Sequence, residues 1–150
     1  MAAIFRRGYS ILIAIGDALR SPLLLGIRLF WGCAFLHAGL GKLGNIDQVI
    51  AFFQSLGIPM PALNAYLAAT VECVGGACLI LGLLSRLISI PLIFTMIIAY
   101  VTADMEAVKM VFSQPLNFVQ REPFTFLFAA ILVFVFGPGS ISLDHWFKKK

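Results

Sequence analysis

The side chains that could do chemistry in this sequence are ionisable residues inside long apolar runs. Glu72 lies near the middle of the run LNAYLAATVECVGGACLILGLL, residues 63–84. A helix over this run is about 33 Å long, enough to cross the hydrocarbon core of a bilayer, and it places Glu72 near the midplane. A lone carboxylate there costs at least a few kcal/mol unless it is paired, protonated or hydrated. Glu72 therefore predicts a polar partner or a polar pocket inside the protein.

The preceding apolar run offers two basic partners for this carboxylate. It is LLLGIRLFWGCAFLHAGLGKL, residues 23–43, and it contains Arg28 and Lys42. Depth counted from the ends of the two runs places Arg28 about 9 Å from Glu72 along the axis, and Lys42 about 14 Å from it. An arginine side chain spans most of the shorter distance, so we predict an Arg28–Glu72 pair. Lys42 is predicted at the outer interface, where it could hold a loop or a ligand headgroup.

This polar cluster has two interpretations. In the first, Arg28 and Glu72 neutralise each other and only fix the register of two helices. In the second, they line a pocket between helices that could bind a quinone ring, a proton or a small anion, because ionisable groups inside membranes commonly mark such sites. Gly75 and Gly76, one turn beyond Glu72, would let the two helices approach closely in either case.

Cys33 and His37 raise the question of a metal site. They lie four residues apart on one helical face and could supply two ligands, but zinc or copper needs at least one more. The alternative is a small apolar cysteine beside a hydrogen-bonded histidine. The only other histidine is His145 in the tail, so a bis-histidine haem within the bilayer is excluded. Flavin and nicotinamide fingerprints are absent. We expect no intrinsic cofactor, and any electron carrier must be a ligand, such as a quinone, or belong to a partner chain.

The composition identifies the class of protein. Of the 150 residues, 61% are hydrophobic and only 12% are charged, whereas soluble domains carry about 25% charge. We predict an all-α integral membrane protein that forms a four-transmembrane-helix bundle. The predicted order along the chain is a cytoplasmic interfacial amphipathic helix at 1–22, a membrane domain at 23–147 with spans at about 23–43, 63–84, 87–103 and 123–137, and a basic tail at 148–150.

The basic residues predict the orientation in the membrane. With four spans both termini share one side, and the positive-inside rule makes that side cytoplasmic. Seven of the 11 basic residues fall on that side: Arg6, Arg7, Arg20, Arg86, Lys148, Lys149 and Lys150. Because membrane orientation accounts for the net charge of +4, we expect the lipid bilayer as the partner and exclude nucleic acid. The protein is expected to be a multi-pass protein of a bacterial inner membrane.

Four sequence blocks in order resemble the DoxX family of membrane proteins. The first is RLFWGCAFLHAGLGKL, the second is F-x-x-x-G-I-P-x-P from Phe53 to Pro61, and the third is VECVGGACLILGLLSR. The fourth runs from Glu122 to the tail GPGSISLD. The resemblance covers about residues 23–147. The residues that match the family pattern are Arg28, Lys42, Glu72, Glu122, Gly137, Pro138, Gly139 and Asp144.

The resemblance implies a four-helix inner-membrane protein linked to redox systems. DoxX and DoxD relatives include a quinone-reducing thiosulfate oxidoreductase and act through partner subunits. The leading hypothesis is therefore a membrane subunit of a redox system, with soluble or membrane oxidoreductase subunits as partners. The rival is a non-enzymatic scaffold, or a protein that handles a small solute or a metal, in which the ion pair is structural. Homo-oligomers are compatible with both, and neither His37 nor the basic N-terminal segment follows from the resemblance.

Overall fold

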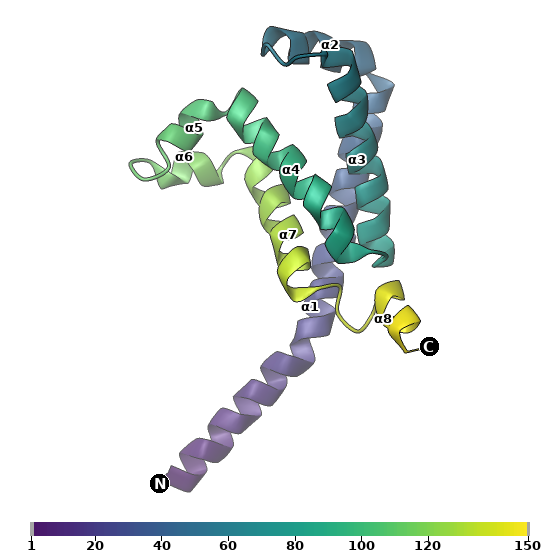
Figure 1. Cartoon of the computed structure of the whole chain (residues 1–150). Coiled ribbons are helices and arrows are strands. Elements are labelled where there is room, and N and C mark those ends of the chain that lie inside the picture. Colours follow the sequence, from purple (N-terminus) through teal and green to yellow (C-terminus); the bar gives the residue numbers. More distant parts are fainter. Residues whose placement is uncertain (1, 150) are drawn as a thin grey trace.

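The computed structural model describes residues 2–149, and every regular element within them is a helix (Figure 1). The side chains of residues 2–5 and of Arg7 lie outside this description. The prediction of an all-α protein is confirmed for the described part of the chain. The elements are α1 (Ala2–Gly44), α2 (Ile46–Ser55), α3 (Pro61–Leu81), α4 (Ser85–Ala103), α5 (Met105–Lys109), α6 (Pro115–Val119), α7 (Glu122–Phe136) and α8 (Leu143–Lys148).

Three of the described helices are long and apolar enough to cross a membrane. They are Gly8–Gly44 within α1, Pro61–Leu81 and Ser85–Ala103. The fourth predicted span corresponds to α7, which is apolar but has only 15 residues, or about 22 Å of helix. The count of four spans therefore remains a prediction, whereas the membrane class of the protein follows from the three long helices.

The structure has no boundary at Pro22, so the described residues 2–22 do not form a helix separate from the first span. Helix α1 runs unbroken over 43 residues with Pro22 inside it. A proline removes one backbone hydrogen bond and kinks a helix, but long apolar helices continue on both sides of such a residue. Figure 1 shows the N-terminal part of α1 projecting away from the other helices. Its placement on the cytoplasmic membrane surface remains a prediction.

The long helices form two packed pairs. Helix α1 packs along α3, α7 packs along α4, and the pairs meet through α3 and α4 and through α1 and α7. Figure 1 shows α2, α5 and α6 at one end of the bundle and both termini at the other. Edge-to-face contacts of Phe126 with Phe35 and Trp31 join α7 to α1. The buried core consists of Phe35, Leu79, Leu92, Met96, Ala130 and Val133.

The short helices α2 and α5 begin without side-chain capping bonds from the residues that precede them. Asn45 precedes α2, and its amide donates to the carbonyl of Gly41 at 3.2 Å instead of capping α2. Asp104 precedes α5 without a side-chain capping bond. The ring of Phe118 on α6 stacks on Tyr100, whose hydroxyl donates to the carbonyl of Phe118 at 2.8 Å. This contact holds α6 against α4.

Candidate functional site

Helices α1 and α3 approach each other closely at their backbones through glycines. A Cβ atom on Gly39 would lie 2.7 Å from the backbone nitrogen of Cys73, and one on Gly76 would lie 2.5 Å from that of Leu36. Neither position has room for a side chain. The prediction that Gly76 faces the first span is confirmed, whereas Gly75 faces Leu92 of α4.

The predicted Arg28–Glu72 pair is wrong, because the carboxylate of Glu72 pairs with Lys42. The prediction aligned the ends of two apolar runs, which placed Lys42 too far from Glu72. The contact between Gly39 and Cys73 shifts α3 relative to α1 and brings Lys42 within reach of Glu72. Arg28 instead lies level with the last turn of α3.

The Lys42–Glu72 pair is asymmetric in its exposure. The Glu72 side chain is 2% exposed and the Lys42 side chain is 30% exposed. The arrangement is therefore a buried carboxylate held by a lysine that remains accessible from one side. A group that accepts a hydrogen bond could contact Lys42 without displacing Glu72.

Arg28 is a structural centre at the end of the bundle that carries the termini. It is 1% exposed. Its Nε donates to the carbonyl of Leu79 at 3.0 Å, and its Nη1 donates to the carbonyls of Pro138 and Ile141, the latter at 3.1 Å. One guanidinium group thus ties α1 both to the end of α3 and to the tail after α7.

Residues of the tail after α7 complete the same connection. The Asp144 carboxylate accepts from the backbone nitrogens of Leu84 at 2.7 Å and Ser85 at 2.9 Å, so it caps the N-terminus of α4. Gly82 has a φ of +67°, and a Cβ atom there would lie 2.8 Å from the Arg28 guanidinium. Gly137 and Gly139 also have positive φ values, of +76° and +80°. We call the assembly of Arg28, Gly82 and residues 137–144 the tail clasp.

Cys33 and His37 lie on the face of α1 that points away from α3. Both are exposed, whereas Gly32 and Gly39 on the other face are buried against α3. Within residues 2–149 as described, no group of three His, Cys, Asp or Glu side chains could hold a metal ion. The two candidate ligands are therefore present without a third ligand from the described part of the same chain.

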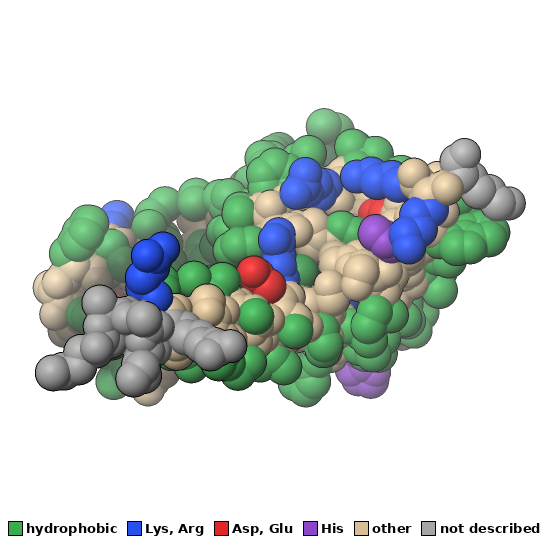
Figure 2. All heavy atoms as spheres, turned by 90° about the horizontal axis from the view of Figure 1, so that it is seen from below, with side chains coloured by type: hydrophobic (Ala, Val, Ile, Leu, Met, Phe, Trp, Pro, Cys, Tyr) green, Lys and Arg blue, Asp and Glu red, His purple; other side chains and the backbone are tan. Residues whose placement is uncertain are grey.

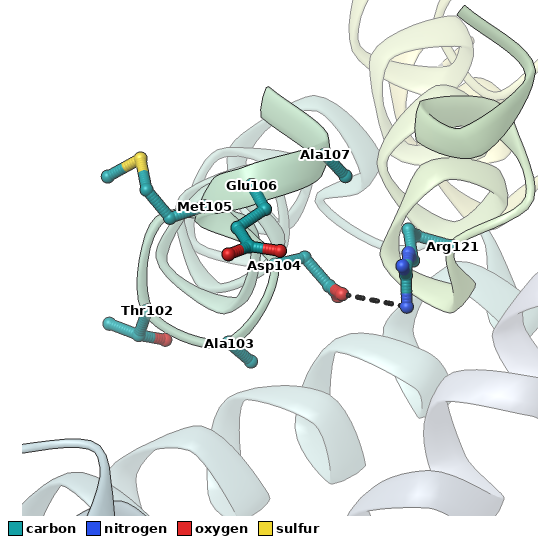
Figure 3. Close-up of a pocket in the computed structure, with 7 residues that line it drawn as sticks. All are labelled: Thr102, Ala103, Asp104, Met105, Glu106, Ala107 and Arg121. Atoms are coloured by element: carbon teal, nitrogen blue, oxygen red, sulfur yellow. Dashed lines mark ion pairs between the residues drawn. The ribbon is translucent and has the colours of Figure 1, made fainter. Parts of the chain in front are cut away.

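A pocket that the sequence did not predict lies where α4 meets α5 (Figure 3). It encloses about 440 Å³ between residues 102–107 and Arg121. An ion pair of 3.3 Å joins Asp104 Oδ1 to Arg121 Nη1 across it. The signal in the sequence was the opposite charge of Asp104 and Arg121, which border residues 105–120. Glu106 also lines the pocket, so its charged side chains are two carboxylates and one guanidinium group.

Comparison with known proteins identifies relatives over most of the chain. The DoxX family model matches residues 23–105. An uncharacterized membrane protein of Mycobacterium tuberculosis is 33% identical over 86% of this chain and 83% of its own length. The inner membrane protein YphA of Escherichia coli is 31% identical over 85% of this chain and 92% of its own length.

A third relative carries a name that refers to chemistry. The protein named "Putative oxidoreductase CatD" of Bacillus subtilis is 32% identical over 54% of this chain and 59% of its own length. No solved structure matches the chain.

Proposed function

The chain belongs to the DoxX family, and from that premise we propose that it is the membrane subunit of a redox system in a bacterial inner membrane. In this proposal the Lys42–Glu72 pair contacts the ligand, which belongs to the class of quinones. The name of the Bacillus subtilis relative supports a redox role, and that of the Escherichia coli relative supports the inner membrane. The electrons would come from a partner oxidoreductase subunit.

The single observation that carries the ligand assignment is the asymmetry of the ion pair. Lys42 is 30% exposed while its partner Glu72 is 2% exposed. A quinone presents two carbonyl oxygens on an apolar ring, so it needs one hydrogen-bond donor inside an otherwise apolar region. The Lys42 ammonium provides that donor, and Glu72 holds it in place while keeping the region electrically neutral.

The proposed topology has four spans with both termini in the cytoplasm. Helix α7 packs along α4, so it lies within the same layer as the longer helices. Its apolar length of about 22 Å is shorter than a hydrocarbon core of about 30 Å, which local thinning of the bilayer accommodates. Exposed basic side chains gather at the end that carries both termini (Figure 2), as the positive-inside rule requires of a cytoplasmic side. They include Arg20, Arg86, Lys148 and Lys149.

Equilibrium binding of a short-chain benzoquinone to the full chain in lipid nanodiscs tests the proposal. We expect Lys42→Met and Glu72→Gln to weaken binding about tenfold, the equivalent of one charged hydrogen bond. Lys109→Met is the matched control, because Lys109 is an exposed lysine on α5 at the same end of the bundle. Unchanged quinone binding by folded Lys42→Met and Glu72→Gln variants would contradict the proposed site.

The second candidate function is a non-enzymatic scaffold in which the pair only joins helices. The observation that favours it is the near-complete burial of Glu72 at the contact between α1 and α3. If the wild-type chain binds no quinone while Lys42→Met unfolds at a lower temperature, the pair is structural and the scaffold is the better description.

A further inference from the structure

An unpartnered stripe of side chains runs along the outer face of α1. Its members follow one another at alternating intervals of four and three residues, the spacing of the seam between two packed helices. Every one of them is exposed, and the leucine and phenylalanine side chains are 55–69% exposed. We call this set the outer stripe: Leu19, Leu23, Gly26, Phe30, Cys33, His37, Leu40 and Gly44.

The glycines of the outer stripe contact no other helix of the described chain. A Cβ atom on Gly26 or Gly44 would have no atom within 4 Å, whereas one on Gly32 or Gly39 would collide with α3. Glycine and other small residues on a membrane helix allow another helix to approach closely. On the α3 side of α1 that helix belongs to the same chain. On the outer side the described structure has no such helix.

His37 indicates that lipid alone does not cover the stripe. It lies seven residues from the end of α1, about 10 Å along the axis, and close to the level at which Gly39 meets Cys73. The hydrocarbon tails of lipids offer an exposed imidazole no hydrogen-bond partner. A protein surface with a polar group at the same level as His37 would supply one.

We propose that the outer stripe is the seam of a homodimer in which α1 of one copy packs in parallel against α1 of a second copy. Copies inserted in the same orientation are related by a two-fold axis along the membrane normal, so each stripe residue faces its own counterpart. The thiols and imidazoles of Cys33 and His37 from both copies then meet in adjacent layers and satisfy one another. Four large side chains with Cys33 and His37 bury on the order of 1,000 Å² in total, the lower size of a specific interface.

Disulfide crosslinking in native membranes tests this dimer. In a chain with Cys73→Ala and Cys78→Ala, Cys33 is the remaining cysteine of the three. We expect copper-phenanthroline to convert this chain into a covalent dimer, because a parallel pair holds equivalent stripe residues within the Cα separation of about 4.4–6.8 Å that a disulfide needs. Moving the cysteine to Phe30 or Leu23, in a Cys33→Ala background, should also give the dimer.

Val74→Cys on α3 is the matched control. Val74 is 50% exposed and follows Cys73, so it lies at a similar depth but outside the outer stripe. We expect it to crosslink about tenfold more slowly than the stripe positions, because it reacts only on random collision and lacks the high effective concentration of a preformed pair. Equal rates at Val74→Cys and at the stripe positions would overturn the dimer. So would the absence of crosslinks at the stripe positions, because lipid or a different protein would then cover the stripe.

Discussion

Lys42 of α1 and Glu72 of α3 form an ion pair in which the lysine is accessible and the carboxylate is buried. The two residues therefore differ in what their loss would expose. Removing the lysine leaves a charged carboxylate in an apolar bundle, whereas removing the carboxylate leaves an ammonium group that can turn toward its open side.

Lys42→Met should destabilise the protein by about 3 kcal/mol, because it leaves Glu72 buried and unpaired. Lys42→Met combined with Glu72→Leu should recover most of this loss, since no charge then remains buried. Thermal unfolding in detergent, followed by circular dichroism, measures both effects. If the double variant is no more stable than Lys42→Met, the pair does not act as a unit.

Arg28→Lys should destabilise the tail clasp by about 3 kcal/mol, because an ammonium group cannot reproduce the fork that reaches Leu79, Pro138 and Ile141. Limited proteolysis should then cut after α7 more rapidly. Arg86→Lys is the control, because exposed Arg86 donates to one carbonyl, that of Val135. Equal protease resistance of the two variants would show that Arg28 does not hold the tail.

Gly76→Ala should cost about 1–3 kcal/mol, because its Cβ atom would lie 2.5 Å from the backbone of Leu36 and force α1 away from α3. Gly26→Ala adds the same methyl group in open space on α1 and should leave the monomer at least as stable. Comparing the two melting temperatures separates helix contact from helix propensity.

Asp144→Ala should destabilise the protein by about 1–2 kcal/mol, because it removes both acceptors from the start of α4. Asp17→Ala removes an exposed carboxylate from α1 and serves as the control. Hydrogen exchange at the amides of Leu84 and Ser85 should accelerate in Asp144→Ala alone. Unchanged exchange at these two amides would contradict the capping role.

Labelling of single cysteines with a membrane-impermeant maleimide tests the topology. In a chain whose three cysteines are replaced by alanine, Phe112→Cys should react in intact cells whose outer membrane, where one is present, has been permeabilised. Phe112 is 98% exposed between α5 and α6. Lys148→Cys should react only after the inner membrane is opened. Equal reactivity of the two positions in intact cells would show that α7 does not cross the bilayer.

The helices could be predicted from the sequence because their signals are local. Runs of apolar residues, the glycine at position 82 and Pro61 at the start of α3 place the long helices within a few residues of their observed limits. The face of α1 that carries Gly32 and Gly39 was also predictable, because the three-four spacing of its residues can be recognised within a single helix. Helix α1 was divided after residue 22 because a proline in a sequence is as compatible with the start of a helix as with its interior in a membrane.

The pairing of charges could not be predicted, because it depends on the register between two helices. A shift of a few residues between the two helices decides whether Glu72 meets Arg28 or Lys42. The ends of the apolar runs do not define the register that closely, whereas the contact of Gly39 with Cys73 does define it. The role of Arg28 was missed for a related reason. Its hydrogen-bond acceptors are backbone carbonyls, which every residue has, so the sequence does not mark them. They are brought to Arg28 by the tail, whose path depends on the positive φ values of Gly137 and Gly139.

The tail clasp also has a consequence for biosynthesis. Arg28 enters the membrane with α1, but two of its three acceptors lie more than 100 residues later in the chain, at Pro138 and Ile141. Until those residues leave the ribosome, the guanidinium group has no tail to bind. Closure of this end of the bundle therefore follows the synthesis of all the long helices, and a chain that stops at Phe136 would leave the Arg28 guanidinium with one of its three acceptors, the carbonyl of Leu79.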